Sequence, residues 1–247
     1  MILWCHRSPA QQMVSMGVFL SRQTVKDAGM SALVYQGTYP GMAARFSHTG
    51  RVTQEVGVRG AFGKLYGSKG SGAMQSKVFG FDYSILFTLR KTGRTRFELG
   101  ATLDNYLHLR EQLHYVNNRD YYECISSIGP TARYSYIFSW RGKQAGKNWE
   151  VNTRIFCPVG AALSTAYSAY EGQAGLHTSS LRTITRDIKL TSWNGLNRFY
   201  WNTGIKVRMR KGSGLSLHYQ WEYYRIKEVS EVQSAMHSLT INYFFLL

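Results

Sequence analysis

Apolar and polar residues alternate along most of this chain of 247 residues. Because successive side chains of a β-strand point to opposite faces, a period of two predicts strands with one apolar and one polar face. The alternation is strongest in residues 79–90, 96–110, 198–210 and 215–222. Weaker alternation covers residues 41–48, 54–66, 131–141, 148–156 and 234–247, and residues 13–22 are typical of a first strand. Helical periodicity is scarce, so the pattern predicts an all-β fold.

The connections between these strands alternate in length. Short connections contain glycine, which adopts the positive φ of tight turns, and occur at 49–50, 91–94, 142–146 and 211–214. Longer connections occur at 23–39, 67–74, 113–129, 159–195 and 230–233. Transmembrane β-barrels have short turns at the periplasmic end and long loops at the extracellular end. This parity predicts an antiparallel up-and-down barrel of about ten strands, with both termini at the periplasmic end.

Strand length and face chemistry favour a membrane barrel over a soluble one. Strands of globular proteins have about 5–6 residues and membrane-spanning strands about 9–11, and several stretches here are longer still. The alternative, a soluble barrel or sandwich, would have to bury large aromatic side chains from every strand. Aromatic residues bound the apolar faces, as in interfacial girdles, at Trp140, Trp149, Trp201, Trp221 and Tyr243. We expect the lipid-facing side chains to include Phe81, Tyr83, Phe87, Phe199, Trp201 and Trp221.

Two segments add a family resemblance to this layout. Residues 26–37 (KDAGMSALVYQG) resemble the first extracellular segment of Bacteroidota outer-membrane barrels of uncharacterised function. Residues 241–247 (INYFFLL) are similar to the final-strand signal that the barrel assembly machinery reads, although that signal usually ends in an aromatic residue. The chain as a whole resembles outer-membrane β-barrel proteins of Gram-negative bacteria. The resemblance implies insertion into the outer membrane by that machinery and contact with outer-membrane lipid and lipopolysaccharide.

The domain organisation is simple. We expect a single barrel domain over residues 11–247, preceded by a remnant of a secretory signal peptide at residues 1–10. Residues 1–5 are apolar but too few for a complete signal, and Ser8, Pro9 and Ala10 resemble a small-residue cleavage site. An ordinary N-terminal segment is the alternative. No apolar run approaches the roughly 18 residues of a transmembrane helix.

The charge of the chain implies anionic partners. Thirty Lys and Arg residues against 14 Asp and Glu residues give a formal net charge of +16. Nucleic-acid binding needs exposed aromatic side chains interleaved with basic ones, but here the aromatic residues fall on the face opposite the arginines, so we expect no nucleic acid. Phosphate groups of lipopolysaccharide are then the expected partner of basic loop residues such as Lys69, Arg182 and Arg186, and simple solvation of these side chains is the alternative.

The face opposite the apolar one would line the lumen, and it is strongly charged. The lumen-facing charged residues are expected to be Arg59, Asp82, Arg96, Glu98, Asp104, Arg110, Arg198, Lys206, Arg208, Arg210 and Glu222. The same face also carries Glu55, Arg90, Arg133, Arg141, Glu150 and Arg154. One interpretation is a lumen filled by Arg–carboxylate pairs, because an unpaired buried charge is unfavourable. The alternative is an anion-attracting channel, although barrels of about eight strands are already filled by side chains.

Catalytic and metal-binding signals are weak. HExxH, P-loop, CxxC and GxSxG motifs are missing and the seven histidines lack metal-ligand spacing, so we expect no metal, no cofactor and no enzymatic activity. His177 and Ser179 faintly resemble the His–Ser stretch of outer-membrane phospholipases, without the Asn and Gly that directly follow the serine in that family. Cys124 and Cys157 are both expected at the extracellular rim, where they either form a disulfide or stay unpaired.

These observations predict a non-enzymatic outer-membrane barrel that acts as a structural or accessory subunit of a cell-envelope complex, in contact with other envelope proteins. A small anion-preferring channel is the alternative, followed by an outer-membrane lipid hydrolase that would use His177 and Ser179.

Overall fold

The structure is a computed structural model that describes residues 11–28, 31–67, 73–113, 120–139, 148–165, 188–209, 212–227 and 231–247. The strands are β1 (Gln11–Asp27), β2 (Ser31–Thr49), β3 (Val52–Gly67), β4 (Ala73–Lys91), β5 (Thr95–Gln112), β6 (Asp120–Ser139), β7 (Asn148–Phe156), β8 (Gly160–Thr165), β9 (Lys189–Thr191), β10 (Leu196–Arg208), β11 (Ser213–Ile226) and β12 (Val232–Leu246). In the described residues, no helix is long and apolar enough to cross a membrane.

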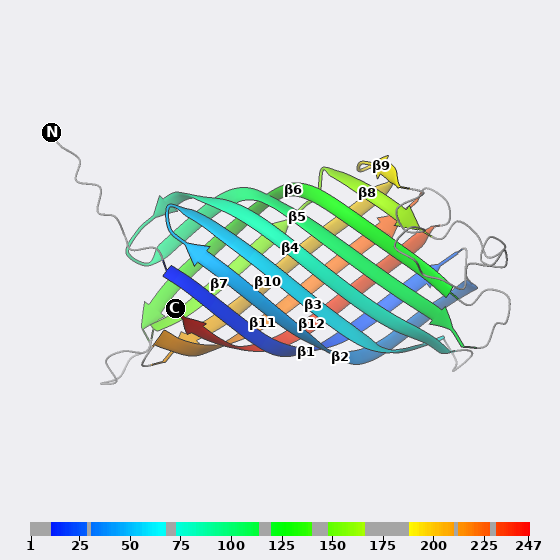
Figure 1. Cartoon of the computed structure of the whole chain (residues 1–247), viewed down its shortest axis with the longest axis horizontal. Coiled ribbons are helices and arrows are strands. Elements are labelled where there is room, and N and C mark those ends of the chain that lie inside the picture. Colours follow the sequence, from blue (N-terminus) through cyan, green and yellow to red (C-terminus); the bar gives the residue numbers. More distant parts are fainter. Residues whose placement is uncertain are drawn as a thin grey trace.

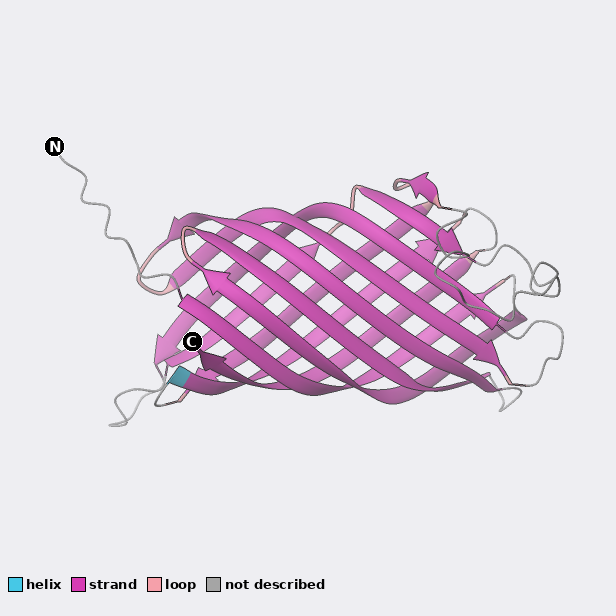
Figure 2. Ribbon diagram, in the orientation of Figure 1, coloured by secondary structure: helices cyan, strands magenta, loops and turns pink. Residues whose placement is uncertain are grey.

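The strands close into an antiparallel barrel of ten positions, as the sequence predicts (Figures 1 and 2). Strand β1 pairs with β2 on one side and with β12 on the other, and β5 pairs with β6, so the ring has no free end. Strands β7 and β8 share one position of the ring, because both pair with β6. Strand β1 begins, and β12 ends, on the same side of the barrel as the short turns (Figure 1).

The two faces of the wall are the reverse of those in a soluble protein: apolar side chains point outward and polar side chains point inward. Exposed apolar side chains point outward from every part of the ring, including Leu20, Met42, Phe62, Phe79 and Ile241. Polar side chains such as Thr53, Ser84 and Glu98 are fully buried inside. An apolar band around a closed strand ladder is stable only in a hydrocarbon solvent, because closure satisfies the backbone hydrogen bonds within the wall. The chain is therefore an outer-membrane type of β-barrel, located in the outer membrane.

The six side chains expected to face lipid all lie on this outer surface. The rings of Phe199 and Trp221 pack with their centroids 5.5 Å apart. The ring of Trp201 meets Tyr219 edge-on at 6.2 Å. Phe81, Tyr83 and Phe87 occupy alternate positions of β4, and their neighbours Asp82, Ser84 and Leu86 point inward.

Several strands are longer than the sequence pattern indicates. Residues 23–39, expected to be a loop, belong mostly to β1 and β2, and the expected loop 113–129 is β6 from Asp120 onward. The reason is that the extracellular parts of these strands extend past the apolar band. There the outward positions are polar, as at Arg22 and Lys26, so the contrast between the two faces that marks a strand is lost.

A β-bulge interrupts the wall between β7 and β8. Thr131 pairs with Phe156 and Ile128 with Gly160, so residues 157–159 oppose only residues 129 and 130. Gly129 leaves the space for this bulge, since a Cβ there would lie 2.2 Å from the carbonyl oxygen of Cys157. The disulfide considered between Cys124 and Cys157 is wrong, and both thiols are free. Cys124 opposes Ser164 whereas Cys157 lies beside Pro130, a separation of about 20 Å along β6, far beyond disulfide reach.

We predict that Ile241→Arg lowers the free energy of unfolding by about 2–4 kcal/mol, because Ile241 points outward in the middle of the apolar band. It is flanked across the ladder by Val18 and Leu217, which are also exposed and apolar. Urea-induced unfolding in lipid vesicles measures the change.

Val207→Arg is the matched control, because Val207 lies one residue from the end of β10 and the interfacial position reduces the penalty to about 0–1 kcal/mol. Equal effects of the two substitutions would contradict the assigned position of the band.

Candidate functional site

The expected lumen residues meet inside the barrel. Nine of them lie on the inner face and make ion pairs there or line its cavity: Arg59, Asp82, Arg96, Glu98, Asp104, Arg110, Arg198, Lys206 and Glu222. Arg208 instead lies exposed at the periplasmic rim, where its Nη2 donates to Oε1 of Gln11 at 3.3 Å. Arg210, Arg141, His177 and Ser179 lie outside the described residues.

Glu55 of β3 is the centre of the charge network in the periplasmic half of the lumen. Its Oε2 lies 3.4 Å from Nη1 of Arg45 and 3.3 Å from Nη1 of Arg154, and its Oε1 accepts from Arg133. Arg45 also pairs with Asp82 at 2.9 Å. Four strands other than β3 thus contribute side chains to the surroundings of one carboxylate.

The network continues along β5 and β6. Glu98 is fully buried, and its oxygens lie 2.7 Å from Nη2 of Arg96 and 2.6 Å from Nη2 of Arg133. Thr53 also donates to Glu98 at 2.7 Å. Glu98 and Glu55 therefore share Arg133, which links the two acidic centres.

A second set of ion pairs crosses the middle of the lumen. Arg198 of β10 pairs with Asp104 of β5 and with Glu222 of β11, each at 2.6 Å. Arg59 of β3 reaches the same Glu222 at 2.7 Å from the opposite wall. The guanidinium of Arg198 also lies over the ring of Tyr106, 5.2 Å from its centroid. These pairs connect opposite walls, so the lumen is bridged.

The extracellular half of the lumen contains a third ion-pair group. Arg110 pairs with Asp27 at 2.8 Å and also donates to Glu123, and all three side chains are buried. The sequence pattern did not identify Asp27 and Glu123, because both fall in segments expected to be loops. Around them pack Tyr35, Leu65, Met74, Ile125 and Tyr224, each at most 1% exposed.

A Ser–His–Glu arrangement lies within this packed layer. Ser76 Oγ is 2.9 Å from Nε2 of His108, and Nδ1 of His108 is 3.4 Å from Oε2 of Glu123. Tyr224 donates to Glu123 at 2.5 Å. The order of groups is that of a serine hydrolase, but all of these side chains are at most 1% exposed. A substrate does not reach Ser76 in this conformation, and the chemistry of the group is that of a buried hydrogen-bond layer.

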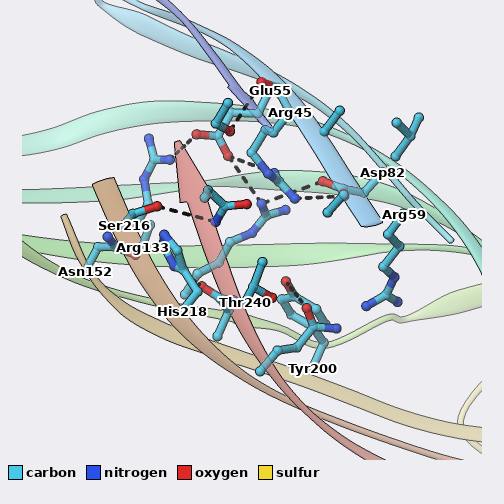
Figure 3. A pocket seen from close by; sticks show the side chains of 18 of the residues that line it. Arg45, Glu55, Arg59, Asp82, Arg133, Asn152, Tyr200, Ser216, His218 and Thr240 are labelled. Carbon is cyan, nitrogen blue, oxygen red and sulfur yellow. Dashed lines mark hydrogen bonds and ion pairs between the residues drawn. The ribbon is translucent and has the colours of Figure 1, made fainter. Parts of the chain in front are cut away.

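The periplasmic half of the lumen keeps a cavity of about 130 Å³ (Figure 3). One wall carries the charged side chains Arg45, Glu55, Asp82, Arg133 and Arg154, and the facing wall carries Lys206 together with the neutral polar side chains Tyr200, Asn202, Ser216, His218 and Thr240. Inward residues near this end, such as Arg45 and Lys206, are partly exposed, whereas those in the extracellular half are buried. Solvent therefore enters the lumen from the periplasmic end.

The charge in this half of the lumen is positive. The ion pairs of this half and of the middle of the lumen contain six arginines and five carboxylates, namely Arg45, Arg59, Arg96, Arg133, Arg154, Arg198, Glu55, Asp82, Glu98, Asp104 and Glu222. Lys206 adds a further positive charge near the cavity mouth, where its cross-strand neighbour is Glu150. Arg45 was absent from the expected lumen set, although it shares its inward face with Ser47. The described residues contain no group of His, Cys, Asp and Glu that could hold a metal ion.

Comparison with known proteins finds likeness in architecture. No protein-family model and no curated protein sequence matches the chain. The translocator domain of the autotransporter NalP from Neisseria meningitidis has a TM-score of 0.46 at 6% identity, over 98% of this chain and 90% of that chain. The transport unit of the autotransporter AIDA-I from Escherichia coli has a TM-score of 0.44 at 8% identity, over 97% and 92%. An outer-membrane channel from Pseudomonas putida has a TM-score of 0.41 at 11% identity, over the whole of both chains.

We predict that Glu55→Gln lowers the free energy of unfolding by about 3–5 kcal/mol, because it leaves Arg45, Arg133 and Arg154 without their shared counter-charge. Denaturant titration followed by the loss of the compact band in unheated gel samples measures it.

Arg225→Gln provides the control, since its ion pair with Glu231 is 38% and 41% exposed at the barrel rim. This variant should unfold as the wild type does, because exposed ion pairs contribute little. A Glu55→Gln protein with unchanged stability would show that the lumen charges are not held as pairs.

Proposed function

We propose that this protein is a non-conducting outer-membrane barrel that serves as a structural or accessory subunit of a cell-envelope complex. The observation that supports the proposal is the packed extracellular half of the lumen, where Arg110, Asp27 and Glu123 are paired and buried among tyrosine and aliphatic side chains. A barrel wall filled in this way spans the membrane and provides no continuous aqueous path. The outer surface, the loops and the periplasmic rim of the barrel are then available for contacts with lipid, lipopolysaccharide and other envelope proteins.

The size of the ring supports the same proposal. Water-filled porins have about 16–18 strands, whereas barrels of about eight are filled by their own side chains. With ten positions in the ring, the ion pairs of Arg59 and Arg198 already connect opposite walls. The charged side chains of the lumen therefore link the walls of the barrel to each other through ion pairs.

A small anion channel is the second candidate, and the periplasmic cavity is the observation that favours it. The cavity has an excess of positive charge and solvent enters it, so anions would concentrate there. Conduction would additionally require the layer around Arg110 to move. The lipid-hydrolase alternative has no comparable support, because His177 and Ser179 lie outside the described residues.

We predict that the purified protein gives no sustained conductance in planar lipid bilayers and no swelling of liposomes in solutions of small sugars. The packed layer around Arg110 blocks the path in both measurements. A trimeric porin reconstituted in the same way provides the positive control.

Stable anion-selective openings would overturn this proposal in favour of the channel, provided that Arg45→Ala weakens them and Arg22→Ala, on the outer surface, does not. Purification in a mild detergent, followed by mass spectrometry of co-purifying proteins, tests the accessory role directly. A stoichiometric envelope partner supports it, and recovery of the barrel alone from cross-linked membranes counts against it.

A further inference from the structure

The strand ladder of the barrel is interrupted where β7 gives way to β8. Strand β10 pairs with β7 from Val207 to Tyr200, and this pairing ends where β7 ends, at Phe156. Residues 196–199 of β10 remain paired with β11 on their other side. No described strand pairs with the β7–β8 side of residues 196–199, because β8 pairs instead with β6 and with the short β9. We call this gap in the ladder, between residues 157–160 and 196–199, the seam.

Two features of the sequence keep the seam from closing. Cys157 and Val159 donate their N–H groups to Pro130 and Ile128 of β6, so the residue between them, Pro158, faces the seam, and proline has no N–H to donate. On the other side, residues 192–195 form a turn closed by bonds from Gly195 and Leu196 to the carbonyl of Ser192. This turn offsets β9 from β10, so the two cannot continue as one strand along β8.

The seam leaves backbone groups without a ladder partner at the level of the membrane interface. Alternate residues of a strand direct N–H and C=O to the same side, and Gly195 faces β11 because its carbonyl accepts from Lys227, so Leu196 and Arg198 face the seam. The N–H of Leu196 is bonded to Ser192, which leaves its carbonyl and both backbone groups of Arg198 without a ladder partner among the described residues. Across β11, Phe199 pairs with the outward-facing Tyr223, and Asn197 pairs with Arg225. This is the transition from aromatic to charged outward positions, which marks the interface of a membrane barrel. Backbone groups at this depth need a polar partner.

The surface around the seam exposes large apolar side chains. Leu190 of β9 is 86% exposed, the highest exposure of any large apolar residue described, and Ile188, Trp193 and Val159 are more than half exposed. Figure 1 shows β9 beside β8 at the edge of the wall, away from the ring. This place therefore combines apolar side chains with backbone groups of β10 that have no ladder partner in the described part of the chain.

Arg198 closes the seam on its lumen side. Arg198 is one of residues 196–199, which line the seam. Its guanidinium pairs with Asp104 and Glu222 and donates to Ser127 of β6 at 3.2 Å. Ser127 opposes Ala161 of β8, so this bond passes behind the seam from β10 to the strand that holds β8. Whatever occupies the seam from outside is thus separated from the lumen.

We propose that the seam binds one lipid molecule of the outer leaflet. The acyl chain lies against Val159, Leu190 and Trp193, and the ester or amide groups of the lipid hydrogen-bond the free edge of β10. A lipid is the occupant that fits, because the seam faces the bilayer at the depth where such groups lie next to acyl chains. This binding is independent of the non-conducting role, since Arg198 keeps the lipid out of the lumen.

Native mass spectrometry of the full chain with dioleoylphosphatidylglycerol tests the proposal. We expect one lipid to stay bound under activation that strips the rest, and Leu190→Ser combined with Trp193→Ala to lower its occupancy about tenfold. Leu217→Ser combined with Leu239→Ser is the matched control, because these residues are exposed and apolar but lie in complete ladder. All variants are first required to show the heat-modifiable gel shift of a folded barrel. Loss of the lipid from the control to the same extent would overturn the proposal.

A phospholipid with a photoreactive acyl chain gives an independent readout that needs no substitution. In vesicles diluted with unlabelled lipid, adducts should concentrate on residues 157–160 and 190–199 relative to Ile205 and Leu217. Adducts spread evenly around the apolar band would overturn the proposal. Retention of a peptide or of a second copy of the chain at residues 196–199, instead of lipid, would also overturn it and identify the seam as a site of strand addition.

Discussion

The hydrocarbon of a bilayer offers no hydrogen bonds, and this constraint determines the rest of the structure. Every backbone N–H and C=O at that depth must be satisfied by a neighbouring strand, which requires a closed ring. Closure turns one face of each strand to lipid and the other to a narrow interior. The apolar residues therefore lie outside, and the charged residues of the wall, among them Arg45, Glu55 and Arg198, are confined to an interior where they must pair with each other.

The pairing of these charges explains why so many arginines are compatible with a narrow lumen. A guanidinium has five N–H donors, so Arg198 bonds two carboxylates and a hydroxyl at once, and Arg133 connects Glu55 to Glu98. Such shared contacts hold the side chains across the lumen from several strands. The cost is the loss of open space, and the cavity of about 130 Å³ that is kept lies toward the periplasm.

Much of this fold follows from the sequence, but only where the two faces of a strand differ. Within the apolar band, the alternation along stretches such as residues 79–90 and 198–210 identifies the strands and their faces, and the parity of the connections predicts the ten positions of the ring. Beyond the band, the outward positions are polar and the inward positions mix polar with apolar side chains, so the pattern does not reveal the extensions of β1 and β6, nor Asp27, Glu123 and the position of Cys124. Arg45 lies on a weakly alternating strand, with Ala43 and Ala44 beside it. The seam depends on the absence of one N–H at Pro158 and on a turn, neither of which changes the period of the pattern.

The pairing of β1 with β12 has a consequence for how the barrel forms. Met13 and Leu246 face each other across this ladder, although almost the whole chain separates them in sequence. Most contacts in the ring join strands that follow each other in the sequence and can form early, but the contact between β1 and β12 must wait until β12 has been synthesised and exported. Until then the first strand has an unsatisfied edge, and the nascent sheet remains open to wrong partners. The final step of folding is therefore the long-range pairing of β1 with β12, which closes the barrel.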